Sequence, residues 1–103
     1  MEFIETPTFT RGITQLLSDD EYAKLQIALM QNPALGDVIR GGGGIRKLRY
    51  ALSGRGKRGG VRMIYYWLNE THQIYMLLAY AKSVKDTLNA QELSVLREFV
   101  KGL

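Results

Sequence analysis

Cysteine is absent from this chain of 103 residues, and histidine occurs once, at position 72. The chain can therefore form no disulfide and no thiolate metal site, and His72 alone does not supply the ligands that zinc or iron requires. We expect no metal and no cofactor. No apolar run approaches the roughly 18 residues that span a bilayer, and the acidic start lacks the basic-then-apolar profile of a signal peptide. These absences favour a protein of the reducing cytoplasm that does not contact membranes.

Acidic residues are absent from one long stretch, residues 40–62, whose sequence is RGGGGIRKLRYALSGRGKRGGVR. This basic stretch holds eight of the fourteen Lys and Arg residues and eight of the eleven glycines, whereas the other eighty residues hold ten acids and six bases. The net charge of +4 therefore understates how strongly charge is segregated. Because glycine lets a backbone approach closely and clustered cations attract phosphates, the basic stretch favours a nucleic-acid partner.

Length and composition predict one domain over residues 1–103, with 46% hydrophobic and 23% charged residues, as in ordinary folded domains. Apolar periodicity, turn residues and two capping boxes, Ser18–Glu21 and Asn89–Glu92, divide the chain into elements. We expect helices over 8–17, between Ser18 and Pro33, and after Asn89, and strands over 2–5, 45–52, 61–68 and 73–81. The predicted fold is α+β, with two N-terminal helices packed on a small antiparallel β-sheet and a C-terminal helix.

Alternation along the predicted strand 45–52 separates its side chains into two faces. Burying an unpaired cation is costly, so Leu48 and Tyr50 should face the core, and Lys47 and Arg49 should project together from the open face. They would lie roughly 7 Å apart, which is near the spacing of consecutive phosphates in a nucleic-acid strand. Arg62 opens the next strand, from which it should reach solvent. The cations of a cation-rich strand more often simply point into solvent. Eight bases without an acid in one stretch nevertheless favour a functional, anion-binding surface.

Two local patterns lead to no site. Residues 54–59, GRGKRG, match the letters of the dinucleotide-binding motif GxGxxG. That motif needs a following helix to place its N-terminus at the pyrophosphate, whereas a strand is expected here, so we reject it. An acid–base pair of Glu70 and His72 is an alternative, but both residues fall in a predicted hairpin turn, where an exposed histidine is the more common interpretation.

From Ile45 onward the sequence IRKLRYALSGRGKRGGVRMIYYWLNE, followed by IYMLLAYAKS and a C-terminal helix, resembles the RelE/ParE superfamily of bacterial toxins. It is most similar to the HigB-type branch, with its GGIRKIR-like entry, KGKRGG-like loop and R-x-IYY strand. The resemblance extends over nearly the whole chain from Ser18. It implies a metal-independent, ribosome-dependent endoribonuclease that cuts mRNA in the A site of the small subunit, and a cognate antitoxin protein that silences it.

The resemblance also implies site residues. RelE-like nucleases carry two basic residues at alternate positions of the first central strand, which correspond here to Lys47 and Arg49. The arginine of the next strand corresponds to Arg62, and a basic residue near the end of the last strand to Lys82. A tyrosine that some members carry in the C-terminal segment has no counterpart, which leaves a role for Tyr66 or Tyr80 open. We expect RNA contacts, including rRNA, from the other cations of the basic stretch, Arg40, Arg46, Arg55, Lys57 and Arg58.

RNA cleavage without a metal uses the neighbouring 2′-OH as nucleophile and needs a base, an acid and positive charge for the phosphorane. Histidine usually transfers the protons, but this chain has no second histidine. Lysine can replace it where neighbouring cations weaken its hold on the proton, and Lys47 lies between Arg46 and Arg49. We therefore expect Lys47 or Lys82 to transfer protons. Arg49 and Arg62 would then stabilise the phosphate.

Two other functions fit the same sequence. One is a ParE-like toxin that inhibits DNA gyrase by binding it, and the other is a non-catalytic RNA- or DNA-binding module. The paired cations on the central strands favour the nuclease, because a toxin that only binds a protein does not need them at that spacing. Cleavage that requires both the ribosome and mRNA would distinguish the three functions.

Overall fold

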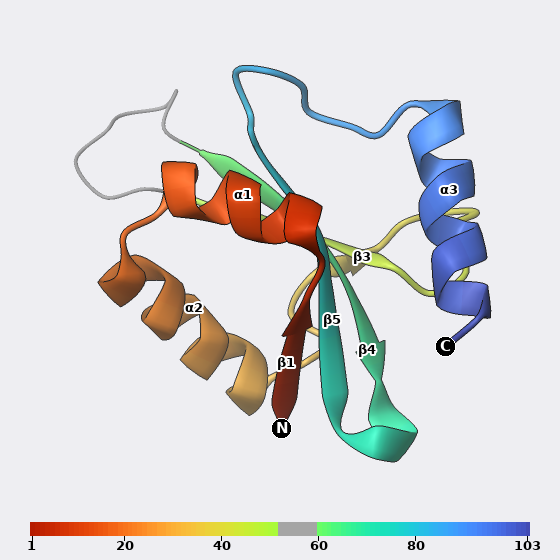
Figure 1. The fold of residues 1–103 in the computed structure, drawn as a ribbon, viewed down its shortest axis with the longest axis horizontal. Helices are drawn as coiled ribbons and strands as arrows, with labels where there is room; N and C mark the ends of the chain where they lie inside the picture. The colour runs from red at the N-terminus through yellow and green to blue at the C-terminus, as the bar shows by residue number, and fades with distance from the viewer. Residues whose placement is uncertain (52–59) are drawn as a thin grey trace.

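The computed structural model describes residues 1–51 and 60–103, so the loop expected between the two central strands, apart from Gly60, lies outside the described residues. The elements are β1 (Glu2–Glu5), α1 (Pro7–Leu16), α2 (Asp19–Gln31), β2 (Asp37–Val38), β3 (Arg46–Tyr50), β4 (Val61–Leu68), the 3-10 turn η2 (Asn69–Thr71), β5 (Gln73–Ala81) and α3 (Ala90–Lys101) (Figure 1). The α+β class and the order of helices are as predicted. The short strand β2 was not predicted.

Each helix begins where a side chain can satisfy its free backbone N–H groups. The Thr6 hydroxyl accepts a hydrogen bond from the Phe9 N–H, and proline follows it at the first position of α1. Ser18 and Asn89 both form complete capping boxes, in which the glutamate three residues later accepts from the N–H of the cap. Both predicted capping boxes are therefore confirmed.

The five strands form one sheet in the order β1-β5-β4-β3-β2 (Figure 1). Neighbours from β5 to β2 are antiparallel, but β1 pairs parallel to β5. The prediction of a purely antiparallel sheet is wrong, because α1 and α2 separate β1 from the other strands and remove the constraint of a hairpin. Thr6 holds the end of β1 to β5, since its N–H and its hydroxyl donate to the carbonyls of Met76 and Leu77.

Both faces of the sheet are packed. On one face, α1 and α2 cover a core that includes Phe9, Leu25, Leu48 and Tyr65. On the other face, α3 packs on a second cluster: Ile45, Ile64, Leu77, Tyr80 and Val100. Leu48 does face the core, as predicted. The face opposite it is not open as expected, however, because α3 and residues 82–89 cover part of it.

Candidate active site

Three strands place polar side chains in one row across the α3 face of the sheet. Arg49 of β3 lies opposite Arg62 of β4, which in turn lies opposite Tyr80 of β5. Opposite residues point to the same face, so all three project together. Lys47, opposite Ile64, lies on this face two residues along β3. The fold therefore brings Lys47, Arg49 and Arg62 together, and it adds Tyr80 to them.

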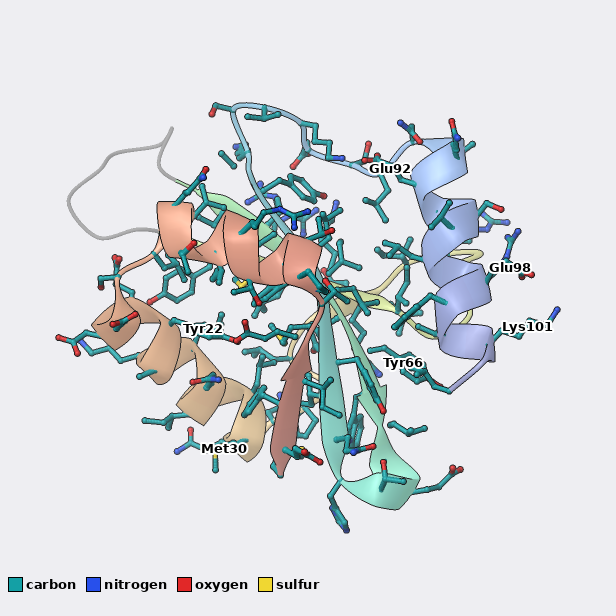
Figure 2. The ribbon with its side chains drawn as sticks, in the orientation of Figure 1. Tyr22, Met30, Tyr66, Glu92, Glu98 and Lys101 are labelled. Carbon is teal, nitrogen blue, oxygen red and sulfur yellow. The ribbon has the colours of Figure 1, made fainter. Side chains whose placement is uncertain are left out.

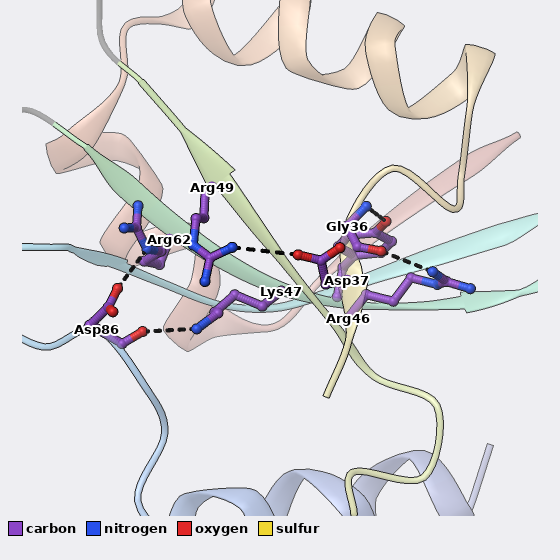
Figure 3. Close-up of polar contacts among 8 residues, drawn as sticks. Gly36, Asp37, Arg46, Lys47, Arg49, Arg62 and Asp86 are labelled. Carbon is purple, nitrogen blue, oxygen red and sulfur yellow. Dashed lines mark hydrogen bonds and ion pairs between the residues drawn. The ribbon is translucent and has the colours of Figure 1, made fainter. Parts of the chain in front are cut away.

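Arg62 is the buried member of this row, with 7% of its side chain exposed. Its Nε donates a hydrogen bond of 3.0 Å to Oδ1 of Asp86 (Figure 3). The expectation that Arg62 would reach solvent is wrong, because residues 82–89 pass beside the start of β4 and bring an anion to it. The hydrogen bond and charge of Arg62, with the charges of Lys47 and Arg49, hold the pKa of Asp86 below its ordinary value.

The backbone carbonyl of Asp86 accepts hydrogen bonds from side chains of the other two strands, β3 and β5. The Lys47 ammonium donates to this carbonyl at 3.3 Å (Figure 3), and the Tyr80 hydroxyl donates to it at 3.4 Å. Burial raises the pKa of Tyr80, and the carboxylates of Asp86 and Glu92 raise it further. Tyr80 therefore keeps its proton at neutral pH and can act as a hydrogen-bond donor.

Arg49 is the most accessible cation of the row. Its Nη1 lies 3.4 Å from Oδ2 of Asp37 on β2, and the two side chains are 55% and 80% exposed. An ion pair so open to water is weak. Both Arg49 and Lys47 also border a groove of about 390 Å³ between α2 and the β2–β3 edge. Because more than half of its side chain is exposed, an incoming anion can reach Arg49 without rearrangement of the fold.

Lys82 follows β5 and lies beside the same site. Its backbone N–H donates to the Gly60 carbonyl at 3.0 Å, and its side chain is exposed. A Cβ added to Gly60 would be 3.4 Å from Nη1 of Arg62 and 3.7 Å from Cβ of Lys82. The two residues thus flank one glycine, and all four residues predicted to be catalytic lie in one region.

Arg46 lies on the opposite face, where it stabilises the backbone. It donates to the Gly36 carbonyl at 2.9 Å and to the Ala34 carbonyl at 3.4 Å. The Gly36 N–H donates to the Tyr65 hydroxyl, which donates to the Pro33 carbonyl. Arg46 therefore helps to hold β2 against β3, away from the row of Arg49 and Arg62.

Of the other predicted RNA-binding residues, only one lies within the described residues. Arg40 is exposed before the glycine run at 41–44. Arg55, Lys57 and Arg58 lie outside the described residues. His72 and Glu70 are exposed in the turn between β4 and β5, at the end of β4 opposite from Arg62.

Sequence reasoning missed Asp86, the anion at the centre of the site. The residue lies in a segment without helix or strand, so neither alternation nor helical periodicity assigns it a face. Its only local signal is a single acid shortly after Lys82 and Lys85. Asp37 was missed for a similar reason, because the two-residue strand β2 carries no periodic pattern.

Fold and site define a small basic α+β protein whose sheet presents a cationic centre suited to a phosphate group. Within residues 1–51 and 60–103, no group of three or more His, Asp or Glu side chains is placed to hold a metal ion. No helix in the described part of the chain has the length and apolar character that crossing a bilayer requires.

Residues 4–103 match the family model described as the RelE toxin of the RelE/RelB toxin–antitoxin system. The match covers nearly the whole chain, which therefore belongs to the RelE toxin family.

Proposed function

We propose that this protein is a metal-independent, ribosome-dependent endoribonuclease that cuts mRNA in the A site and so inhibits translation. The observation that carries the proposal is the convergence of Lys47, Arg49 and Arg62 on one face, in a chain of the RelE toxin family. Lys82 completes the cationic centre from the end of β5. A protein that acts only by binding gyrase has no need of such a centre.

The proposed chemistry gives each of these groups a role. A base removes the proton of the 2′-OH, the 2′-oxygen attacks phosphorus, and the bond from phosphorus to the 5′-oxygen breaks as an acid protonates that oxygen. Lys47 and Lys82 are the two candidates for these proton transfers. Arg49 and Arg62 neutralise the charge that grows on the phosphorane oxygens, and Tyr80 can donate a further hydrogen bond. The products are a 2′,3′-cyclic phosphate and a 5′-hydroxyl.

The ribosome supplies what this small site lacks. A site without histidine catalysis gains most from a substrate that is already held in the reactive conformation, and orientation of that kind lowers a barrier by several kcal/mol. We propose that Arg40, Arg46, Arg55, Lys57 and Arg58 contact rRNA and mRNA and hold the protein in the A site of the small subunit. The protein would then act in the cytoplasm.

We further place the chain in the HigB-type branch, on the motifs from Ile45 to Tyr66, and expect a cognate antitoxin of the RelB type. An antitoxin that neutralises this protein should carry acidic residues, because they complement the basic stretch. Asp86 and Asp37 already pair with Arg62 and Arg49 within the chain.

The first prediction concerns Lys47. Purified protein, ribosomes and a defined mRNA are combined, and cleavage is mapped by primer extension. Wild type should cut only when ribosome and mRNA are both present. Lys47→Ala should cut about 100-fold more slowly or worse, because it removes a proton-transfer group, and should melt close to wild type. Lys101→Ala is the matched control, because Lys101 is an exposed lysine on α3 (Figure 2) and should cut normally.

Three results would contradict the proposal. Equal cleavage of free RNA would remove the ribosome dependence. Gyrase inhibition without cleavage would favour the ParE-like alternative. Binding of RNA without cleavage under any condition would favour the non-catalytic module.

A further inference from the structure

Residues 82–89 place Asp86 directly on the proposed catalytic cations. Its carboxylate accepts the hydrogen bond from Arg62, and its carbonyl accepts those from Lys47 and Tyr80. Three strands therefore direct a donor at one residue. Asp86 supplies a full negative charge and a carbonyl dipole at the point where the proposed reaction needs the scissile phosphate.

A carboxylate and a phosphate compete for the same donors. Both offer anionic oxygens to the N–H groups of arginine, with similar geometry and similar hydrogen-bond lengths. With Asp86 in place, Nε of Arg62 already has its acceptor. A phosphate that uses the same N–H must displace the carboxylate.

The exposure of the two partners shows from which side displacement can occur. The Arg62 side chain is 7% exposed, whereas the Asp86 side chain is 54% exposed. The guanidinium thus belongs to the packed sheet, and the carboxylate lies over it from the solvent side. Asp86 can therefore leave toward solvent while Arg62 stays in place.

Contacts on either side of Asp86 hold the segment without making it part of the core. The Lys85 ammonium pairs with Glu92 of α3 and lies 4.9 Å from the centre of the Tyr80 ring. Leu88 packs against the second core cluster. Between these two points Asp86 lies in backbone that is neither helix nor strand. Its displacement therefore breaks contacts to Arg62, Lys47 and Tyr80 but no strand pairing.

We propose that Asp86 occupies the phosphate position of this site, so that residues 82–89 inhibit RNA binding from within until the substrate displaces the carboxylate. The inference rests on the proposed function to the extent that these cations bind an RNA phosphate. It adds a regulation of the same site. RNA that makes several other contacts displaces Asp86 readily, whereas a short free RNA competes with it poorly.

The test measures binding without cleavage. The probe is a short fluorescent single-stranded RNA with 2′-O-methyl groups, which cannot be cut because its nucleophile is blocked, and its affinity for the full chain is followed by anisotropy at low salt. Asp86→Asn should bind about fivefold to tenfold more tightly than wild type, because an ion pair that the phosphate must break is gone.

Two controls separate this effect from a general change of charge. Glu98→Gln also removes one negative charge, from an exposed residue on α3 that faces away from the sheet (Figure 2), and should change the affinity less than about twofold. In an Arg62→Gln background the Asp86→Asn change should bring no gain, because the cation that the carboxylate occupies has been removed.

Unchanged or weaker binding by Asp86→Asn overturns the proposal and makes Asp86 a residue that positions Arg62 for RNA. If the Asp86→Asn variant does not fold, a measurement on the wild-type protein tests the proposal instead. Saturation with the 2′-O-methyl RNA should raise the pKa of Asp86 toward its ordinary value, because the phosphate takes the place of the carboxylate at Arg62, and a pKa that stays low overturns the proposal. If wild type cleaves mRNA on ribosomes but Asp86→Asn does not bind RNA more tightly, this inference fails and the proposed nuclease stands. Tighter binding without any cleavage defeats the proposed nuclease and leaves the inhibition standing.

Discussion

At the scale of single residues, Arg62 shows how burial and charge act together. A guanidinium at 6% residue exposure would be costly without an anion. Asp86 supplies that anion from a different part of the chain, and its own pKa is lowered by the contact. The groups that face it are Arg62 on β4, Lys47 and Arg49 on β3, and Tyr80 on β5.

The pKa of Asp86 is a direct test of this arrangement. It is lowered in the folded protein from an ordinary value of 3.8. The ion pair therefore stabilises the folded protein at pH values above 3.8. This contribution is lost as the pH falls through the lower pKa of the folded state. Arg62→Gln should return the pKa of Asp86 toward 3.8 and remove this part of the acid dependence of thermal unfolding. Carboxyl NMR titration measures the pKa, and an Asp86 that titrates normally in wild type would contradict the ion pair in solution.

At the scale of elements, α1 packs closely on β5 because it has a glycine at the point of contact. A Cβ at Gly12 would lie 2.6 Å from the backbone carbonyl oxygen of Ala79, which is too close for any side chain. On either side of it, Phe9 and Ile13 are buried in the core. The position of α1 therefore depends on Gly12, although glycine is a poor helix former.

Gly12→Ala should destabilise the protein even though alanine favours helix by about 1 kcal/mol. The clash is with backbone, so α1 or β5 must shift, and overpacking of this kind costs about 1 to 3 kcal/mol. Chemical denaturation gives the free energy of unfolding. Gln15→Ala, at an exposed site on the same helix, should be neutral or slightly stabilising. A Gly12→Ala protein as stable as wild type would show that α1 does not approach β5 so closely.

At the scale of the whole molecule, charge is distributed so that one region attracts polyanions. The basic stretch crosses β3 and enters β4, and the chain carries a net charge of +4. Binding of single-stranded RNA through phosphates should then release counterions and weaken as salt rises.

The salt dependence of binding gives the number of phosphate contacts. Five or six contacts predict a slope of log K against log salt of about −4, since each contact to a single strand adds about −0.7. Lys47→Ala should reduce the magnitude of the slope by about 0.7, and Lys101→Ala should leave it unchanged. The measurement uses the 2′-O-methyl RNA at several salt concentrations. An affinity that is independent of salt would exclude phosphate recognition.

Much of the fold and part of the site could be predicted from local sequence. The bounds of β4 and β5 and both capping boxes follow from neighbouring residues, and alternation correctly places Leu48 in the core and Lys47 on the other face. The parallel pairing of β1 was not predictable in this way, because pairing across two helices depends on how they pack. The solvent access expected for Arg62 failed because strand position does not reveal what covers the strand.

The sequence by itself determined most elements of this protein and the cations on its central strands, because caps and strand alternation depend on residues close together in the chain. Only the tertiary structure decided what those cations contact. Arg62 and Asp86 are 24 residues apart in sequence, and they meet because β4, β5 and the segment after β5 fold back on one another. Because Arg62 is buried, its charge needs an anionic partner. That partner, Asp86, occupies the position proposed for the substrate phosphate.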